Sequence, residues 1–190
     1  GLKRMMISSG RDLVIRRFDF QIGEVGDYSA TMMKPEIWKL VEAEHLLLIQ
    51  GDSVMCNDGL DEFLEYDYVG APWNHKPDNI SVGNGGFSLR SRRLMEWCAS
   101  NYTKHRNDPE DLFFSHCALE HGRVPSSDIA VYFSMESVWT PAPMGVHKLW
   151  WSMIMASSNK TKEEVEALLC AHCPAIADVP GTGVVCGTIQ

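Results

Sequence analysis

The chain has 190 residues, and its 25 acidic side chains outnumber the 17 basic ones, which gives a formal net charge of -8. This acidic balance excludes a typical nucleic-acid-binding protein, which would present a basic face. Apolar residues make up 45% of the sequence, enough for a substantial core, so the composition excludes a wholly disordered chain. No apolar run approaches the roughly 18 residues that a membrane-spanning helix needs. The length predicts one domain with room for an appendage.

The chain starts with Gly1 and shows no secretory signal, so we interpret it as a processed piece of a longer protein. Three sequons, which begin at Asn79, Asn101 and Asn159, favour a secretory lumen such as the Golgi, although the cytoplasm stays open. The segment Cys170-Ala-His-Cys173 resembles half of a zinc site, but it has no second Cys/His pair at a suitable spacing. The wide spread of cysteines is not typical of a disulfide framework. They stand at positions 56, 98, 117, 170, 173 and 186.

The first half of the chain predicts short strands alternating with helices. In order we expect a strand within 11–20, a helix over 27–40 with Pro35 near a helix start, a strand over 45–50, a short helix over 59–66, a strand over 67–70 and a loop over 74–81. The run from His45 to Gln50 is almost continuously apolar, which is typical of a strand covered on both faces. It ends at Gly51-Asp52-Ser53.

The second half continues the alternation. We expect a strand over 87–90, a helix over 91–99, a helix capped by Asp108 with Pro109 in its first turn, a strand over 129–133, and a helix that begins at the capping box Thr161-x-x-Glu164. The end, 174–190, is rich in Gly, Pro and small residues and is expected to be extended or poorly ordered. Strands that alternate with helices predict an α/β fold, in which ligands bind at the carboxyl ends of strands.

A glycine-rich stretch, Ser81 to Arg92, is the most unusual feature of the sequence. Gly83, Gly85 and Gly86 fall within four positions, just before the strand predicted over 87–90. One interpretation is a tight hairpin, because Asn84-Gly85 is a strong two-residue turn signal. The other is that a bulky ligand lies against this backbone. Both alternatives stay open on this stretch alone.

Three positions are candidates for binding a charged ligand or for proton transfer. Asp52, at the end of the most apolar strand, can coordinate a hard cation that bridges phosphates, or it can be a turn residue. Asp111, next to Glu110 at a helix start, can be a general base, or the two can simply favour the helix dipole. His147 lies beside a cation, Lys148, and can reach a diphosphate or a metal, although a lone His is more often structural.

Trp73 is a further candidate because it follows Ala71-Pro72. Its ring can offer a flat apolar face to a sugar, although a Trp in such a position more often belongs to the core.

Four strings together resemble an uncharacterised domain family that is grouped with the glycosyltransferases, and the resemblance extends from about Tyr28 to Trp151. The strings are LLLIQGDS (46–53), LDEFLEYDYVGAPW (60–73), GNGGFSLRS (83–91) and PEDLFF (109–114). More distantly, the plan is similar to the nucleotide-sugar transferases of the GT-A type. The resemblance implies a single Rossmann-like GT-A type domain with a mixed, mostly parallel central sheet flanked by helices, over residues 1–156, with residues 157–190 as a C-terminal helix and extended tail.

The resemblance also implies roles for individual residues. Asp52 and His147 would hold Mn²⁺ or Mg²⁺ on the donor diphosphate, and Asp111, with Glu110 beside it, would supply the catalytic base. Substrate-binding roles would fall to Trp73, Asn84, Gly85, Gly86 and Lys148. Two departures from that pattern stand out: Gln50-Gly51-Asp52 has one carboxylate where two are usual, and few residues precede the first predicted strand.

The leading hypothesis is therefore a metal-assisted glycosyltransferase that moves a sugar, most simply from a UDP-sugar, to an acceptor hydroxyl with inversion. Two alternatives remain. One is a catalytically silent module that binds a glycan or a nucleotide sugar. The other is a structural part of a larger assembly, with a partner on the tail after Ser157.

Overall fold

The computed structural model describes residues 3–6, 12–15, 25–76 and 80–187 of the chain. Its strands are β1 (Lys3–Met6), β2 (Asp12–Ile15), β3 (His45–Ile49), β4 (Ser53–Met55), β5 (Tyr68–Val69), β6 (Phe87–Ser91), β7 (Ser134–Met135) and β8 (Gly145–His147). Its helices are α1 (Val25–Met32), α2 (Pro35–Lys39), α3 (Arg92–Asn101), α4 (Glu110–His121), α5 (Ser127–Phe133), α6 (Trp151–Ser157) and α7 (Lys162–His172), with short 3-10 helices η1 (Leu60–Phe63) and η3 (Pro174–Asp178).

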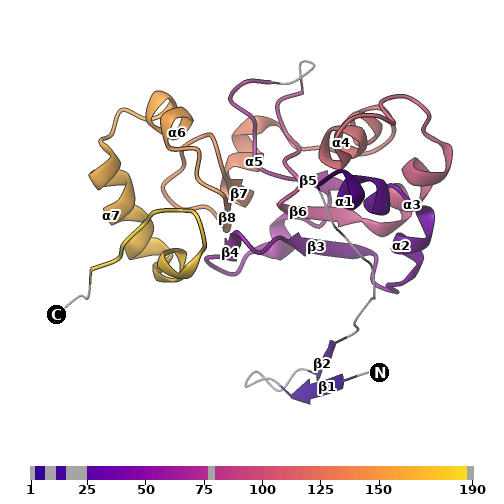
Figure 1. Cartoon of the computed structure of the whole chain (residues 1–190), viewed down its shortest axis with the longest axis horizontal. Coiled ribbons are helices and arrows are strands. Elements are labelled where there is room, and N and C mark those ends of the chain that lie inside the picture. The colour runs from indigo at the N-terminus through magenta and orange to yellow at the C-terminus, as the bar shows by residue number, and fades with distance from the viewer. Residues whose placement is uncertain (1–2, 7–11, 16–24, 77–79, 188–190) are drawn as a thin grey trace.

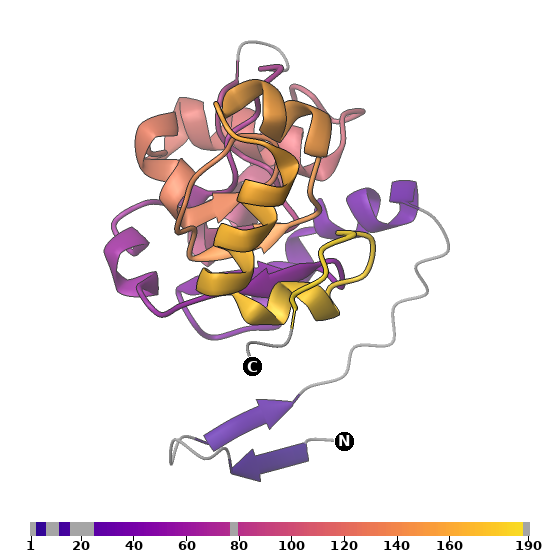
Figure 2. The same cartoon turned by 90° about the vertical axis from the view of Figure 1, so that its left-hand side faces the viewer.

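The strands form a two-stranded hairpin and two sheets of three strands. In the first sheet β6 lies between β3 and β5 and is antiparallel to both. In the second, β8 lies between β4, to which it is antiparallel, and β7, to which it is parallel. Figure 1 shows helices α1 to α4 gathered around the first sheet and α6 and α7 beside the second. The hairpin of β1 and β2 stands apart from the other elements in both views (Figures 1 and 2).

The expected Rossmann-like GT-A type α/β domain with a mostly parallel central sheet is wrong. Among the described strands only β7 and β8 pair in parallel, and the chain forms two small sheets in place of one extended sheet. Parallel neighbours need a crossover connection of a dozen or more residues, usually a helix. Here β3 runs through a short turn into β4, and the chain returns from β5 to β6 without a described helix. The first sheet is therefore antiparallel.

Two predicted elements differ from the structure because short apolar runs do not fix a period. The segment predicted as a strand over 129–133 belongs to helix α5, in which Ala130 and Phe133 are buried and Ile129 and Tyr132 are exposed. The apolar strand predicted over 45–50 is present as β3, but it is not covered on both faces. It is an edge strand of its sheet, and Ile49 is 52% exposed.

Several other local predictions are confirmed, with shifted ends. Pro35 opens α2, although the helix expected over 27–40 is divided into α1 and α2. Thr161 and Glu164 form the predicted capping box of α7. The prediction that Asp108 caps α4 is wrong, because the N-cap position is Pro109 and Asp108 contacts His105.

The six cysteines form three disulfides, so the expectation that they do not make a disulfide framework is wrong. The pairs are Cys56–Cys173, Cys98–Cys117 and Cys170–Cys186. The half zinc site at 170–173 is thereby excluded, because both of its thiols are oxidised. Sequence spacing could not reveal this pattern, since the partners of Cys56–Cys173 lie 117 residues apart.

The C-terminal segment is packed, in contrast to the poorly ordered tail that its composition predicts. Ile176 and Val184 are buried in the same hydrophobic cluster as Val146 of β8 and Leu169 of α7. Residues on both sides of the proposed boundary at 156 therefore share one core. The disulfide Cys170–Cys186 also joins this segment to α7.

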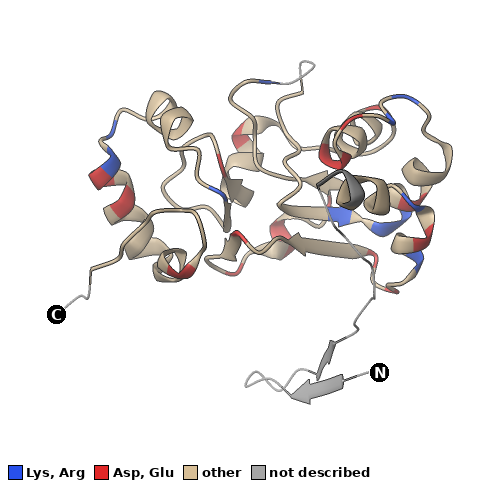
Figure 3. Ribbon diagram, in the orientation of Figure 1, with Lys and Arg blue, Asp and Glu red and all other residues tan. Residues whose placement is uncertain are grey.

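Charged residues of both signs occur on many of the described elements (Figure 3). Lys and Arg are interspersed with Asp and Glu along the described elements (Figure 3). Among the described helices, none combines the length and the hydrophobicity that crossing a membrane requires. Of the three sequons, Asn101 and Asn159 are exposed, and Asn79 lies outside the described residues.

Candidate functional site

A cavity of about 400 Å³ collects most of the candidate residues. It receives Asp52 from the turn between β3 and β4, Glu110 and Asp111 from the start of α4, and His147 and Lys148 from the end of β8. The other lining residues are Tyr28, Ser29, Gln50, Pro109, Glu136 and Trp150. Residues more than 90 positions apart in sequence thus meet in one hollow, as the candidate roles require.

Strand pairing explains how the second sheet delivers its residues to this cavity. The β4–β8 register places Ser53 opposite His147, so Asp52 lies beside the end of β8, and the Lys148 amide donates to the Asp52 carbonyl at 3.0 Å. The parallel β7–β8 register pairs Met135 with Val146. Glu136, the next residue after β7, therefore lies beside His147.

His147 is held by a hydrogen-bond network that fixes the direction of its ring. The Asn84 amide nitrogen donates to Glu136 Oε1 at 2.9 Å, and Asn84 Oδ1 accepts from the Gly86 amide at 3.0 Å. The side-chain oxygen of Asn84 therefore faces His147 Nδ1, which lies 2.9 Å away and donates to it. His147 Nε2 then points toward Asp52 Oδ1 at 3.4 Å.

The Asp52–His147 pair fits the implied Mn²⁺ or Mg²⁺. Adjacent ligands of an octahedral ion bound at about 2.1 Å lie about 3 Å apart, close to the observed spacing. The hydrogen bond from His147 Nδ1 to Asn84 is the kind of outer contact that orients a metal-binding imidazole. With Asp52 and His147 as the protein ligands, the remaining ligands of such an ion would come from a bound diphosphate and from water.

Asp111 has the properties of a general base. It is half-buried in the first turn of α4, and burial, followed by the negative charge of Glu110, raises its pKa to about 6. The Leu112 amide, which donates to Asp111 Oδ1 at 2.9 Å, and the charge of Arg90 offset part of this increase. A carboxylate with a pKa near the working pH is well suited to accept a proton in the transition state.

Glu110, which the sequence also suggests as catalytic, is committed to a buried ion pair. Both of its oxygens accept from the Arg90 guanidinium, at 2.6 and 3.2 Å, and the Arg90 side chain is fully buried. The guanidinium also lies over the ring of Tyr68. We therefore assign Glu110 to positioning the start of α4 and to raising the pKa of Asp111.

The glycines are required by the side chains that line the cavity. A Cβ on Gly86 would overlap the His147 ring, and a Cβ on Gly85 would lie 2.6 Å from Glu110 Oε1 and 2.9 Å from the Asp111 Cβ. The Gly86 carbonyl accepts from the Gln50 amide and from the Ser53 hydroxyl, each at 2.9 Å. The absence of a side chain at Gly85 thus lets Asp111 approach this backbone, and its absence at Gly86 lets His147 approach it. The hairpin alternative is not observed.

Lys148 and Trp73 occupy different settings. Lys148 has a left-handed backbone (φ 34°), which is uncommon outside glycine, and its Nζ lies 4.6 Å from the centre of the Trp150 ring at the cavity. Strain of this kind is concentrated at functional sites. Trp73 is buried, lies beside the Gly83 backbone and is not among the residues that line the cavity. Its placement agrees with the core alternative.

Sequence reasoning missed Glu136, Tyr28 and Trp150. Glu136 is buried and its Oε1 also accepts from the Trp150 indole at 3.3 Å. Burial raises the pKa of Tyr28, which contacts Gln50. The one signal that would have placed Glu136 beside His147 is the strand at 134–135. It was not recognised in the sequence because it directly follows the apolar residues of helix α5.

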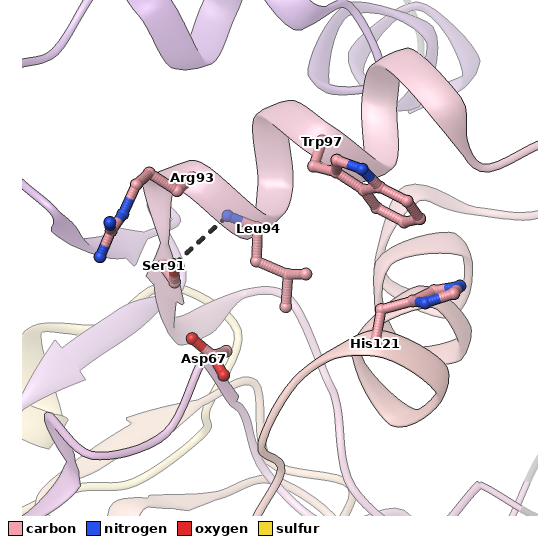
Figure 4. Close-up of a pocket in the computed structure, with 6 residues that line it drawn as sticks. All are labelled: Asp67, Ser91, Arg93, Leu94, Trp97 and His121. Carbon is pink, nitrogen blue, oxygen red and sulfur yellow. Dashed lines mark hydrogen bonds between the residues drawn. The ribbon is translucent and has the colours of Figure 1, made fainter.

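A second hollow, of about 450 Å³, lies by α3 (Figure 4). In it Trp97 and His121 face each other, and Arg93 extends away from them (Figure 4). Ser91 caps α3 through the Leu94 amide, and Asp67 accepts from the Arg123 amide. Its polar groups thus serve local structure, and none of the predicted site residues lines it, so we retain the other cavity as the candidate site.

The chain belongs to the family described as "Protein of unknown function (DUF5672)", whose model matches residues 13–147. No curated protein and no solved structure matches the chain. The matched region includes Asp52, Asp111, Glu136 and His147, whereas α6, α7 and the segment after them lie beyond it.

Proposed function

We propose that the chain is a glycosyltransferase that moves a sugar from a nucleotide sugar, most simply a UDP-sugar, to an acceptor hydroxyl. One observation carries the proposal: a carboxylate with a raised pKa, Asp111, lines the same cavity as the Asp52–His147 pair and Lys148. A base and a set of groups suited to a diphosphate thus share one hollow. Its volume of about 400 Å³ is within the usual range of small-molecule sites.

In the proposed reaction the acceptor oxygen forms a bond to the anomeric carbon while the bond from that carbon to the diphosphate oxygen breaks. The electron pair of the broken bond leaves on the diphosphate, and the acceptor proton passes to the Asp111 carboxylate. Attack from the face opposite the diphosphate inverts the anomeric centre. Lys148 lies where its ammonium can offset charge on the diphosphate. A manganese or magnesium ion held by Asp52 and His147 would supply further positive charge to the leaving group.

A second candidate is a catalytically silent module that binds a nucleotide sugar. It is favoured by the metal position itself, where, among the described residues, Asp52 supplies one carboxylate to His147 Nε2 in place of the usual two. In either case the three disulfides suit an oxidising compartment, and with exposed sequons at Asn101 and Asn159 they support a secretory lumen.

The test is a thermal-shift panel of nucleotide sugars with and without manganese, followed by measurement of released UDP in the presence of hydroxyl acceptors. We expect manganese-dependent stabilisation by a donor, and UDP release that Asp111→Asn abolishes while donor binding remains. Asp52→Asn should remove the manganese dependence, and the exposed Asp58→Asn should change neither. Binding without release would favour the silent module, and the absence of binding by every nucleotide sugar would refute both candidates.

A further inference from the structure

A second group of potential metal ligands lies near the start of α4, apart from the residues that line the candidate cavity. His105 and Asp108 come from the loop between α3 and α4, and His116 comes from the second turn of α4. One ligand atom from each residue lies within 4.8 Å of the others, and all three side chains are half-buried. None of them lines the candidate cavity. His116 lies about 9 Å along α4 from Glu110, given the rise of 1.5 Å per residue.

The loop that carries two of these residues is held in place. The Asp108 amide donates to the His105 carbonyl at 3.1 Å, and His105 has a left-handed backbone (φ 58°). Arg106 ties this turn to α3, since its guanidinium donates to the carbonyls of Tyr102 and Ala99 at 2.8 and 2.6 Å. The positions of His105 and Asp108 are thus set before any ligand binds, which lowers the entropy cost of binding.

The side-chain geometry brings the two imidazoles together. The rings of His105 and His116 stack with centroids 3.6 Å apart and an interplanar angle of 8°, and His105 Nδ1 lies 2.9 Å from Asp108 Oδ2. Ligands of a tetrahedral zinc ion bound at about 2.0–2.1 Å lie about 3.3 Å apart. Because parallel rings direct their nitrogen lone pairs along parallel lines, binding a common ion requires that the rings turn out of the stack, and the spacing of the ligand atoms, within 4.8 Å of one another, leaves that turn as the main rearrangement.

We propose that His105, Asp108 and His116 bind a divalent transition-metal ion of the zinc class, at a site separate from the catalytic cavity. Two imidazoles and one carboxylate are a typical donor set for zinc, with water as the fourth ligand. The pair in the cavity, by contrast, suits an oxygen-seeking ion that keeps most of its ligands from diphosphate and water. The new site joins the 105–108 turn to the body of α4, directly before Pro109 and the Glu110–Asp111 pair.

The test uses the full chain with its disulfides intact, stripped with a chelator and without a polyhistidine tag. Calorimetric titration with Zn²⁺ should give one site in the micromolar range or tighter. His116→Gln and His105→Gln should each weaken binding at least 10-fold, because even the loss of an outer-shell partner of a metal ligand typically costs 10- to 100-fold. His121→Gln is the matched control, since His121 also lies on α4 and also contacts an aromatic ring, that of Trp97.

A second readout protects against variants that unfold. Co²⁺ added to the unsubstituted chain should give the intense visible absorption of tetrahedral coordination, and Zn²⁺ should displace it. Asp52→Asn should leave both signals unchanged, which separates this site from the cavity. The proposal would be overturned if the chain bound no Zn²⁺ at a 100-fold molar excess of the ion. It would also be overturned if folded His116→Gln bound Zn²⁺ with unchanged affinity. The stacked rings and the His105–Asp108 contact would then be structural only.

Discussion

Replacing Asp111 by Asn should make the protein more stable at neutral and alkaline pH. Burial and the charge of Glu110 raise the pKa of Asp111 from its ordinary value of 3.8 to about 6. One pKa unit corresponds to about 1.4 kcal/mol, so ionised Asp111 lowers the free energy of unfolding by up to about 3 kcal/mol. Asn removes this charge, and its side-chain oxygen can still accept from the Leu112 amide. Loss of the attraction to Arg90 offsets part of the gain, so we expect about 1–3 kcal/mol.

The gain should depend on pH in a defined direction. Because the folded chain holds the Asp111 proton more tightly than the unfolded chain does, the stabilisation from protonated Asp111 is fully present below about pH 3.8 and is lost as the pH rises through about 6. The advantage of Asp111→Asn should therefore be near zero at about pH 3.5 and reach its full size above about pH 7. Under the proposed function the same carboxylate must be ionised to act as a base, so turnover by the unsubstituted chain should fall below about pH 6.

The assay is urea unfolding, monitored by tryptophan fluorescence at several pH values from 3.5 to 8. No reductant is added, so that the disulfides stay intact. Asp58→Asn, at an exposed position away from the cavity, controls for the general loss of an acidic charge. An Asp111→Asn protein that is equally or less stable than the unsubstituted chain at pH 8 would refute the argument. A gain that does not vary with pH would show that it arises from something other than the carboxylate charge.

Two further substitutions test the scaffold around the base. Glu110→Gln should lower the free energy of unfolding by about 3–5 kcal/mol, because it leaves the buried Arg90 guanidinium without its counter-charge; urea unfolding checks this, and adding Arg90→Met should recover much of the loss. Gly86→Ala should cost about 1–3 kcal/mol and weaken manganese binding, because the new Cβ overlaps the His147 ring. Gly51→Ala, whose Cβ would meet nothing within 4 Å, is the control, and equal effects from both would contradict the packing argument.

Three candidate residues chosen from the sequence line one cavity, whereas the fold predicted around them was wrong. Asp52, Asp111 and His147 were identified from chemistry and from a resemblance, and neither depends on strand direction. The predicted fold was wrong because the direction of a strand depends on the strands with which it pairs. The local periodicity of the sequence does not reveal those partners. The segment 129–133 shows the limit most clearly: five apolar residues fit a strand as well as the helix that the structure contains. Glu136 was missed for the same reason, since only the β7–β8 pairing brings it to His147.

The base side of the cavity, with Asp111, and the metal side, with Asp52 and His147, meet at Gly85 and Gly86 but are otherwise held by different contacts. On the base side, the Arg90–Glu110 pair positions Asp111. On the metal side, the β4–β8 pairing positions Asp52 and His147, and that sheet is joined to the C-terminal segment through Val146 in its hydrophobic cluster.

The disulfide Cys56–Cys173 connects the residue after β4 to the end of α7, so its two ends lie on the metal side, although the loop that it closes also contains Asp111. Its loop spans 117 residues, for which the chain-entropy model gives a stabilisation on the order of 4–5 kcal/mol. Replacing both cysteines by Ser should therefore lower stability and weaken manganese binding in the cavity, while the pH at which turnover falls, set by Asp111, stays near 6. The disulfide Cys98–Cys117, which joins α3 to α4, provides the converse case, in which replacing both cysteines by Ser should affect the base side more than manganese binding. If the Cys56–Cys173 variant shifted the pH profile as much as it weakened metal binding, the two sides would not be independent.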